Sequence, residues 1–529
     1  MDLSGILKVF DELPAFSAVM QGLDGETAVP PLLLPPGARA PVLARLFRSR
    51  QVPILLLTGK VDAASRWMQA LEAWLPDDQN VYRFYEPTPL PYDRGPWGET
   101  ARISRLRVLS RLMAGQHPQI PAPTAPPLIV TSARAFLQKT LAKRRFLTAT
   151  RVLRVGRRLD LEKTLKNWAD IGYEAVSVVE APGQFSRRGG IVDIFPPSSA
   201  FPVRIELFGD EIDTMRYFDL ATQRSLEMDK AAQETGIVVP PAREALPGVA
   251  QGYGLSIPDD ELPAEGNLPS WRDDIADLRN GRIFAHLEFY LPLIYAQPVT
   301  LLDYLPENAL VVVDDWRELL TAVSELDQHA NQIAAEQPML PPDYPSPIFD
   351  WPVIEPDLSW WQPLILGEGP ETTERPFGGL ADAFEPGPRY GGQMRPLLTQ
   401  LKQTRIENDR VVVVSLQAAR LAELWREENR DNTSSLLLPN AAAQAHAVES
   451  LPTLPEPGTL TFVHGAIGDG FNLVRREDNK ILLDLLSDAE IFGWSRPAPR
   501  RWQAPAGTHW RCAASPWQPA SPRRCRWKA

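Results

Sequence analysis

Residues 183–219 read GQFSRRGGIVDIFPPSSAFPVRIELFGDEIDTMRYFD, and they predict a small antiparallel meander. Ile191–Phe195 is a short run of β-forming residues that two prolines stop. Pro202–Phe208 alternates apolar and polar side chains, as a strand with one buried face does. Gly209-Asp210 then turns the chain, and Glu211–Phe218 runs back.

The alternation in the middle strand assigns side chains to two faces. Val203, Ile205 and Leu207 lie on one face, and Arg204, Glu206 and Phe208 lie on the other. We expect the apolar face to pack on a core, which leaves Phe208 beside Arg204 on the outward face. An aromatic next to an arginine is the composition of a protein-binding hot spot. A stray surface phenylalanine is equally compatible with alternation alone.

Three sequence segments resemble the insertion that two bacterial repair families share, UvrB and the transcription-repair coupling factor Mfd. They are RGGIVDIFPP, FPVRIELFGDEID and FDLATQRS. In both families this small domain docks the UvrA protein. The resemblance implies that Arg188, which precedes a glycine, and Arg204 and Phe208 in the next strand contact UvrA. Arg187 is adjacent and is a candidate for the same role. The docking domain is predicted over residues 151–244.

Composition limits the classes of protein that the chain can represent. The net charge of −11 excludes a whole-surface nucleic-acid binder but leaves room for local basic patches. Cys512 and Cys525 are the only cysteines, which excludes a disulfide framework or a cysteine metal site and fits a reducing cytosol. The six histidines have no ligand spacing, and no apolar run is long enough to span a membrane. We expect a cytoplasmic monomer of several domains without metal or cofactor.

A failed phosphate-binding loop is predicted near the N-terminus. Thr58, Gly59 and Lys60 lie between a predicted strand and a predicted helix, in the order that such a loop needs. However, Ile54 stands where the loop requires glycine, and Val61 stands where it requires Ser or Thr. Backbone amides then cannot wrap a phosphate, and no hydroxyl is available to bind magnesium. The remnant therefore predicts a chain that binds no nucleotide and is not an enzyme.

Strand and helix signals alternate around this loop, which predicts a parallel α/β layer. Glu99–Met113 is an arginine-rich helix whose arginines we expect on its solvated side. The words EPTPLPYDRG and IVTSARAFLQ are similar to the first domain of the coupling factor. The strand Ala309–Val313 ends in Asp314 and Asp315, which we interpret as a capping or solvated pair rather than a magnesium site. One long helix is predicted over Trp316–Gln337.

The resemblance implies a multidomain α/β fold. Residues 1–150 and 245–337 correspond to a degenerate UvrB/helicase-like α/β domain, interrupted by the small α+β UvrA-docking domain. Residues 338–392 are rich in proline and lack periodicity, which predicts a linker. Residues 393–494 resemble the small α/β third domain of the coupling factor, in which Gly465, Gly468 and Gly470 are expected to form a hairpin turn rather than a phosphate loop.

Residues 495–529 differ from the rest of the chain. They contain no acid, and their four tryptophans follow no helix or strand period. Such a tail can grip RNA by stacking and charge, or it can be an out-of-frame translation. In the family, the word SDAEIFG leads on to a polymerase-interaction domain and an ATP-driven DNA translocase. We therefore expect a truncated coupling factor, in which RNA polymerase and DNA are partners only through the missing half.

Two function classes follow. The first is a non-enzymatic module that recruits UvrA in transcription-coupled nucleotide excision repair, a response to DNA damage. The alternative is the ATP-dependent DNA translocase or helicase activity of the full-length family. A UvrB-like nucleic-acid binder is a weaker third interpretation, because the net charge is acidic.

Overall fold

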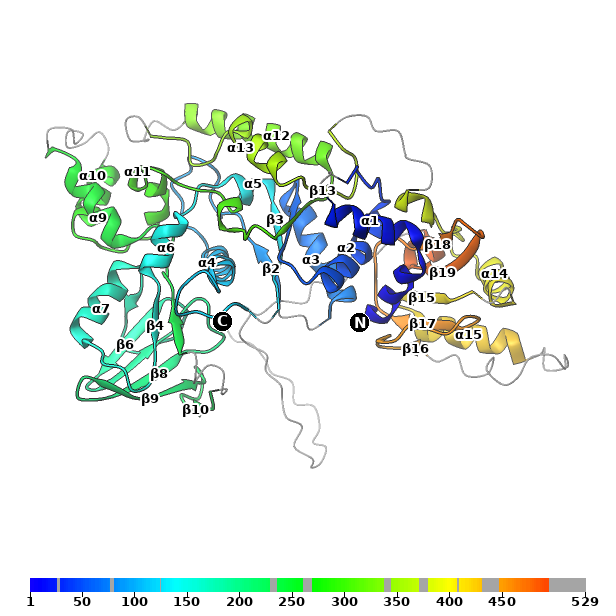
Figure 1. Ribbon diagram of the computed structural model, residues 1–529, viewed down its shortest axis with the longest axis horizontal. Coiled ribbons are helices and arrows are strands. Elements are labelled where there is room, and N and C mark those ends of the chain that lie inside the picture. The colour runs from blue at the N-terminus through cyan, green and yellow to red at the C-terminus, as the bar shows by residue number, and fades with distance from the viewer. Residues whose placement is uncertain are drawn as a thin grey trace, which may run out of the picture.

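The computed structural model describes residues 1–25, 29–76, 80–123, 125–228, 236–259, 269–336, 344–370, 379–406, 409–430 and 447–493. The predicted tail 495–529 and both cysteines lie outside these residues. Figure 1 shows three parts side by side: a six-stranded sheet at lower left, a central α/β body, and a second α/β unit at right. No helix in the described part of the chain is long and apolar enough to cross a membrane.

The central body is built on a parallel sheet with the strand order β13-β12-β1-β3-β2. The strands are β1 (Ile54–Thr58), β2 (Val81–Phe84), β3 (Leu128–Ser132), β12 (Leu310–Val313) and β13 (Leu364–Ile365). Strand β1 is buried along its whole length, as an apolar run covered on both faces should be. The predicted parallel layer is confirmed.

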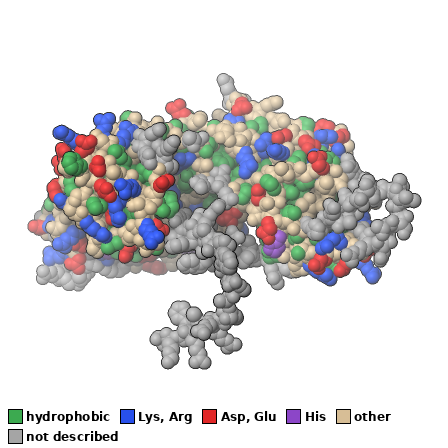
Figure 2. All heavy atoms as spheres, turned by 90° about the horizontal axis from the view of Figure 1, so that it is seen from below, with side chains coloured by type: hydrophobic (Ala, Val, Ile, Leu, Met, Phe, Trp, Pro, Cys, Tyr) green, Lys and Arg blue, Asp and Glu red, His purple; other side chains and the backbone are tan. Residues whose placement is uncertain are grey.

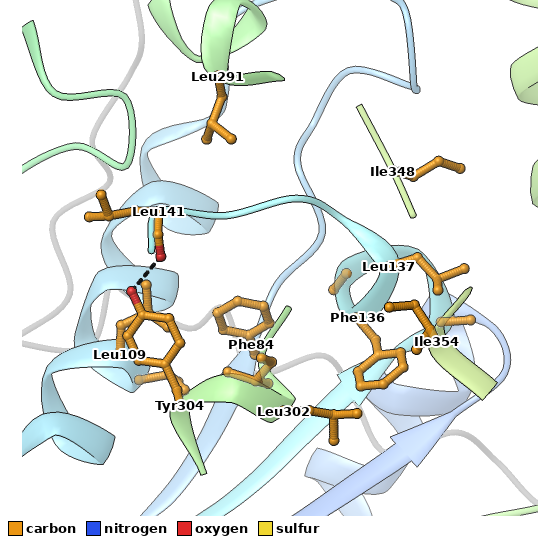
Figure 3. Packing of buried hydrophobic residues seen from close by; sticks show 14 of the residues in the cluster. Phe84, Leu109, Phe136, Leu137, Leu141, Leu291, Leu302, Tyr304, Ile348 and Ile354 are labelled. Atoms are coloured by element: carbon orange, nitrogen blue, oxygen red, sulfur yellow. Dashed lines mark hydrogen bonds between the residues drawn. The ribbon is translucent and has the colours of Figure 1, made fainter. Parts of the chain in front are cut away.

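Helices cover both faces of this sheet. They are α3 (Val61–Trp74), α4 (Glu99–Met113), α5 (Ala133–Leu137), α12 (Trp316–Glu336) and α13 (Trp351–Trp360). Figure 3 shows Phe84, Phe136 and Leu302 packed in the core on one side of the sheet. There the Tyr304 hydroxyl donates to the Leu141 carbonyl at 2.6 Å, so the one polar atom of that ring is satisfied inside the core.

The expectation that the arginines of α4 are solvated is wrong for Arg105. Its side chain is fully buried, and its Nε and Nη2 donate to the two carboxylate oxygens of Glu244 at 2.5 and 3.1 Å. The Thr140 hydroxyl also donates to Glu244. Helical periodicity could not reveal this arginine as a core residue, because its counter-ion lies 139 residues away in the sequence.

The six-stranded sheet is the predicted meander with additions, in the order β10-β9-β8-β7-β6-β5. Its strands are β5 (Glu174–Ala175), β6 (Gln184–Arg188), β7 (Ile191–Ile194), β8 (Val203–Phe208), β9 (Glu211–Phe218) and β10 (Ser225–Leu226). The β6–β9 pairs are antiparallel, which confirms the meander. Val203 and Ile205 are fully buried in the core beneath α7 (Leu161–Asp170), as the alternation predicts.

The sheet joins the body through two chain crossings. On entry, α6 (Lys143–Ala149) leads into β4 (Arg151–Leu153), and on return β11 (Ile237–Val239) pairs with β4. Beyond β11, Arg243 pairs with the buried Glu288 at 2.6 Å. The body continues through α9 (Pro247–Ser256), α10 (Pro269–Arg279) and α11 (Leu291–Ile294).

Residues 338–392, expected as an unpatterned linker, contain regular structure where they are described. Helix α13 packs on the central core, β13 adds the edge strand of the central sheet, and β14 (Phe384–Glu385) adds the edge strand of the third sheet. Strands of two residues are too short to show an alternating pattern. Their pairing therefore depends on the partner strands and is invisible in the local sequence.

The third sheet has the order β14-β18-β19-β15-β17-β16. Its further strands are β15 (Val411–Ser415), β16 (Ala447–Val448), β17 (Leu460–His464), β18 (Phe471–Arg475) and β19 (Lys480–Leu486), with helices α14 (Met394–Ile406), α15 (Ala418–Arg430) and α16 (Asp488–Phe492). The loop with Gly465, Gly468 and Gly470 is not the expected hairpin turn, because β17 and β18 are not neighbours. The loop crosses over the sheet, and a Cβ at Gly470 would collide with the Leu485 carbonyl.

The N-terminal segment links the central and third parts. It comprises a 3-10 helix, η1 (Ser4–Glu12), followed by α1 (Pro14–Asp24) and α2 (Pro36–Arg50). The Gly5 amide donates to the Leu451 carbonyl at 3.0 Å, and the Leu451 amide donates to Asp2. One apolar cluster runs from the central sheet through these helices to Val412 and Val414 of β15. The two α/β units therefore share a continuous core.

Candidate functional site

The sheet brings Arg188, Arg204 and Phe208 to one face. Arg188 on β6 lies opposite Ile191 on β7, which lies opposite Glu206 on β8. Directly opposite residues share a face, and so do residues two apart on one strand. Arg204 and Phe208 flank Glu206 by two positions each, so both join the face that carries Arg188.

Arg187 lies on the other face. It pairs in register with Val192, which is fully buried in the core. Its guanidinium forms an ion pair with Glu162 of α7 at 2.5 Å. Arg187 is therefore not brought together with the other three residues, although it precedes Arg188 directly in the sequence.

Arg188 and Phe208 lie at the same end of the sheet. Each precedes a turn glycine with positive φ, Gly189 at 63° and Gly209 at 65°. The Leu207 amide donates to the Gly190 carbonyl at 2.9 Å, which holds the two turns side by side. Phe208 is 83% exposed, and Ile191 between the two turns is 39% exposed. A largely exposed aromatic ring therefore stands beside a cation and a second apolar side chain.

Arg204 is held much more tightly than the other two residues. Its Nε and Nη2 donate to Asp193 Oδ1 and Oδ2 at 2.8 and 2.9 Å, and the guanidinium lies 4.6 Å from the Phe218 ring centroid. Hydrogen bonding to Asp193 raises the pKa of Arg204 above its ordinary value. Asp193 is buried, and it was missed by sequence reasoning. The signal for it was a lone acid in the β-forming run IVDIF, in register with the arginine.

The phosphate-loop remnant is occupied by contacts within the chain. A Cβ on Gly59 would come within 2.6 Å of the Glu318 carbonyl oxygen, because the loop packs against the start of α12. Lys60 pairs with Glu325 on the same helix at 3.0 Å. The Thr58 hydroxyl donates to the Thr131 carbonyl at 3.2 Å. The lysine that would meet a phosphate is thus turned toward a carboxylate.

Asp314 and Asp315 at the end of β12 are buried rather than solvated, and the side chain of Asp315 alone caps a helix. Arg39 Nη1 lies 2.9 Å from Asp314, and its Nη2 lies 3.4 Å from Asp315. Asp315 accepts the Glu318 amide at 3.1 Å at the start of α12. Their charge is therefore compensated by an arginine and by a helix N-terminus.

The described residues contain no cluster of three or more His, Cys, Asp or Glu side chains that could hold a metal ion. Figure 2 shows Lys and Arg side chains interspersed with acidic ones at both ends of the face in view, which agrees with a net acidic chain of mixed surface charge.

Comparison with known proteins gives this geometry a family context. Residues 152–243 match the UvrB interaction domain. A transcription-repair-coupling factor of Myxococcus xanthus is 28% identical over 540 residues, which cover 93% of this chain. The chain is homologous to transcription-repair-coupling factors. Those of Bacillus subtilis, at 28% identity over 56% of the chain, and Mycobacterium bovis, at 30% over 61%, also match.

The chain spans 40% of the Myxococcus relative and about a quarter of the other two. The UvrB interaction domain begins within β4 and ends at Arg243, so it encloses the whole six-stranded sheet and α7. All three predicted contact residues lie inside it.

Proposed function

We propose that the UvrB interaction domain of this chain docks UvrA through the face formed by Arg188, Arg204 and Phe208. The chain then acts as a UvrA-recruiting module in transcription-coupled nucleotide excision repair. The observation that carries the proposal is the 83% exposure of Phe208 at the end of β8. A buried, packed aromatic at this position would leave the face without an apolar anchor.

The three residues divide the work of docking. Phe208 supplies apolar area to a pocket on the partner, and Arg188 supplies an exposed charge beside it. Arg204 is fixed by Asp193 before the partner arrives, so it loses little conformational entropy on binding. The face carries Glu206 as well, which the Thr214 hydroxyl bonds at 3.1 Å.

We propose that these 529 residues recruit UvrA without hydrolysing ATP. Lys60 is committed to Glu325, and Gly59 is covered by α12, so the β1–α3 loop offers no space for a phosphate. The proposed docking needs no nucleotide, because every residue of the face is already in place.

The test is a titration of purified UvrA against the full chain and against Phe208→Ala, without nucleotide. Loss of a hot-spot aromatic typically costs about 2 kcal/mol or more, so we expect the affinity to fall roughly thirtyfold. Leu255→Ala is the matched control, because Leu255 is a 65% exposed apolar residue on α9, outside the face. Equal affinities for the parent and Phe208→Ala, or no binding of the parent at micromolar UvrA, would refute the assignment.

A further inference from the structure

Residues 100–159 contain thirteen Lys and Arg and no Asp or Glu, in a chain whose net charge is −11. Sixty consecutive residues without an acid are conspicuous in a sequence that holds 66 of them. The cations of such a segment can form ion pairs and hydrogen bonds inside the protein, or they can form a positively charged surface that attracts a polyanion. The structure shows which cations serve each purpose.

The first part of the segment uses its cations internally. Arg105 pairs with buried Glu244, and Lys139 donates to the Ser346 carbonyl at 2.7 Å. Arg134 donates to the backbone carbonyls of Pro87 and Pro89, both at 2.6 Å. These side chains join elements of the central body, so they are not available to a ligand.

The second part exposes its cations. Arg144 and Arg145 on α6, Arg151 at the start of β4, and Arg157 just beyond it are all exposed. Among the described residues, none of these four forms an ion pair with a carboxylate. Arg145 lies 5.8 Å from the ring centroid of Tyr295, and Arg151 donates to the Thr150 carbonyl at 2.9 Å. Their positive charges are thus held at the surface and left uncompensated.

These cations follow one another along the junction between the central body and the UvrB interaction domain, where Figure 1 shows α6 above β4. We call residues 143–158 the basic track. Helix α6 contributes about 10 Å and strand β4 about 10 Å more, and the chain then turns, with the Arg157 amide donating to the Arg154 carbonyl. The neighbouring strand β11 is Ile-Val-Val and adds no acid. A duplex about six base pairs long has a similar length.

We propose that the basic track binds the phosphate backbone of a nucleic-acid duplex. Backbone contacts need exposed cations without counter-ions, which the four arginines named above provide. Arg158 at the end of the track lies 3.8 Å from Asp210 and is not one of them. Single-strand binders add exposed aromatic rings on which bases stack. The aromatic ring within the track, Phe146, is buried against Tyr304, so the track favours a duplex.

The basic track ends beside the hairpin that carries Phe208. The Ile212 amide donates to the Arg157 carbonyl at 3.0 Å. The backbone of Arg158 forms an isolated antiparallel β-bridge with the backbone of Glu211, the residue opposite Phe208. A duplex on the track and a protein on the docking face would therefore be immediate neighbours. The inference itself rests on the charge and exposure of the track and does not depend on UvrA docking.

The test measures fluorescence anisotropy of labelled 20-base-pair DNA and RNA duplexes with the full chain at several salt concentrations. For Arg144→Ala/Arg145→Ala and for Arg151→Ala/Arg157→Ala we expect about tenfold weaker binding and a log–log salt slope smaller by about 1 to 2. Arg66→Ala/Arg420→Ala removes two arginines that are 67% and 58% exposed elsewhere, and it should bind like the parent. Arg144→Lys/Arg145→Lys should also retain binding.

Parent-like binding by both track variants would overturn the proposal, as would a parent that binds no duplex at micromolar concentration and low salt. Tighter binding of single strands, or binding only to vesicles of anionic lipid, would overturn it too. The relative affinity for the DNA and RNA duplexes identifies which backbone the track accepts. Unchanged UvrA affinity of the track variants would separate this site from the docking face.

Discussion

Arg204 of β8 lies directly opposite Asp193 of β7, and two parallel hydrogen bonds of 2.8 and 2.9 Å join their side chains. Asp193 is almost completely buried, whereas part of Arg204 reaches solvent. Arg204 therefore has two roles, as the counter-ion of a buried carboxylate and as a proposed contact for UvrA. A substitution of Arg204 alone perturbs both roles.

A double substitution separates these roles. We expect Arg204→Ala to lower the free energy of unfolding by about 2–4 kcal/mol, because it leaves a buried carboxylate unpaired. Arg204→Ala/Asp193→Ala should recover part of that loss, while its UvrA affinity stays low. Thermal denaturation and UvrA titration of the two variants test this. If the double variant binds UvrA as the parent does, Arg204 serves the fold alone.

The buried pair Arg105–Glu244 should be essential for the junction between the body and the UvrB interaction domain. Glu244→Gln leaves a fully buried guanidinium without its counter-ion, and we expect a loss of about 3–5 kcal/mol in unfolding free energy. Glu162→Gln removes one partner of the exposed pair with Arg187 and should cost less than about 1 kcal/mol. Denaturant unfolding compares the two; similar losses would contradict the assigned role of Arg105.

ATP turnover should be absent from this chain in the presence of duplex DNA. Lys60 is paired with Glu325, and Arg39 compensates the two acids at the end of β12. A phosphate-release assay with and without Lys60→Ala measures this. Turnover above the no-protein blank that disappears in Lys60→Ala would show a working site.

The third sheet should make stability depend on pH through Asp484. Burial, with the charges of Asp409 and Glu490, raises the pKa of Asp484 to about 7, and its Oδ1 has no hydrogen-bond partner in the described structure. Because the folded-state pKa lies above the unfolded value, the folded state holds this proton more tightly. The contribution of the protonated Asp484 to the free energy of unfolding is therefore full at low pH, and it is lost as the pH rises from about 4 to 7.

Asp484→Asn isolates this effect. An amide cannot ionise, and its N–H can donate toward the unpartnered Oδ1 of Asn472, the residue directly opposite on β18. We expect the variant to be more stable than the parent by about 1–3 kcal/mol at pH 8, and nearly equal to it at pH 4. The melting temperatures of the variant and the parent at pH 4 and pH 8 test this expectation. If the variant melts higher than the parent by the same amount at both pH values, ionisation of Asp484 is not the cause.

The elements with strong local periodicity were predictable from the sequence. The meander of β7, β8 and β9 and the helices α4 and α12 form where alternation or helical spacing indicated. The common face of Arg204 and Phe208 was predictable as well, because a strand repeats every two residues whatever surrounds it. The residues at positions 54 and 61 also predict a phosphate loop that does not bind, and this stays a prediction.

Tertiary structure alone decided which charges are internal. Arg105 and Arg144 belong to the same acid-free segment, yet one is buried against Glu244 and the other is exposed on α6. Arg187 and Arg188 are adjacent but face opposite sides of the sheet. In the same way, the two-residue strands β13 and β14 exist only through their partners. The sequence determined the local periodicity, because periodicity depends on backbone geometry. Whether a charged side chain is buried or exposed depended on counter-ions far along the chain, which only folding brings into contact.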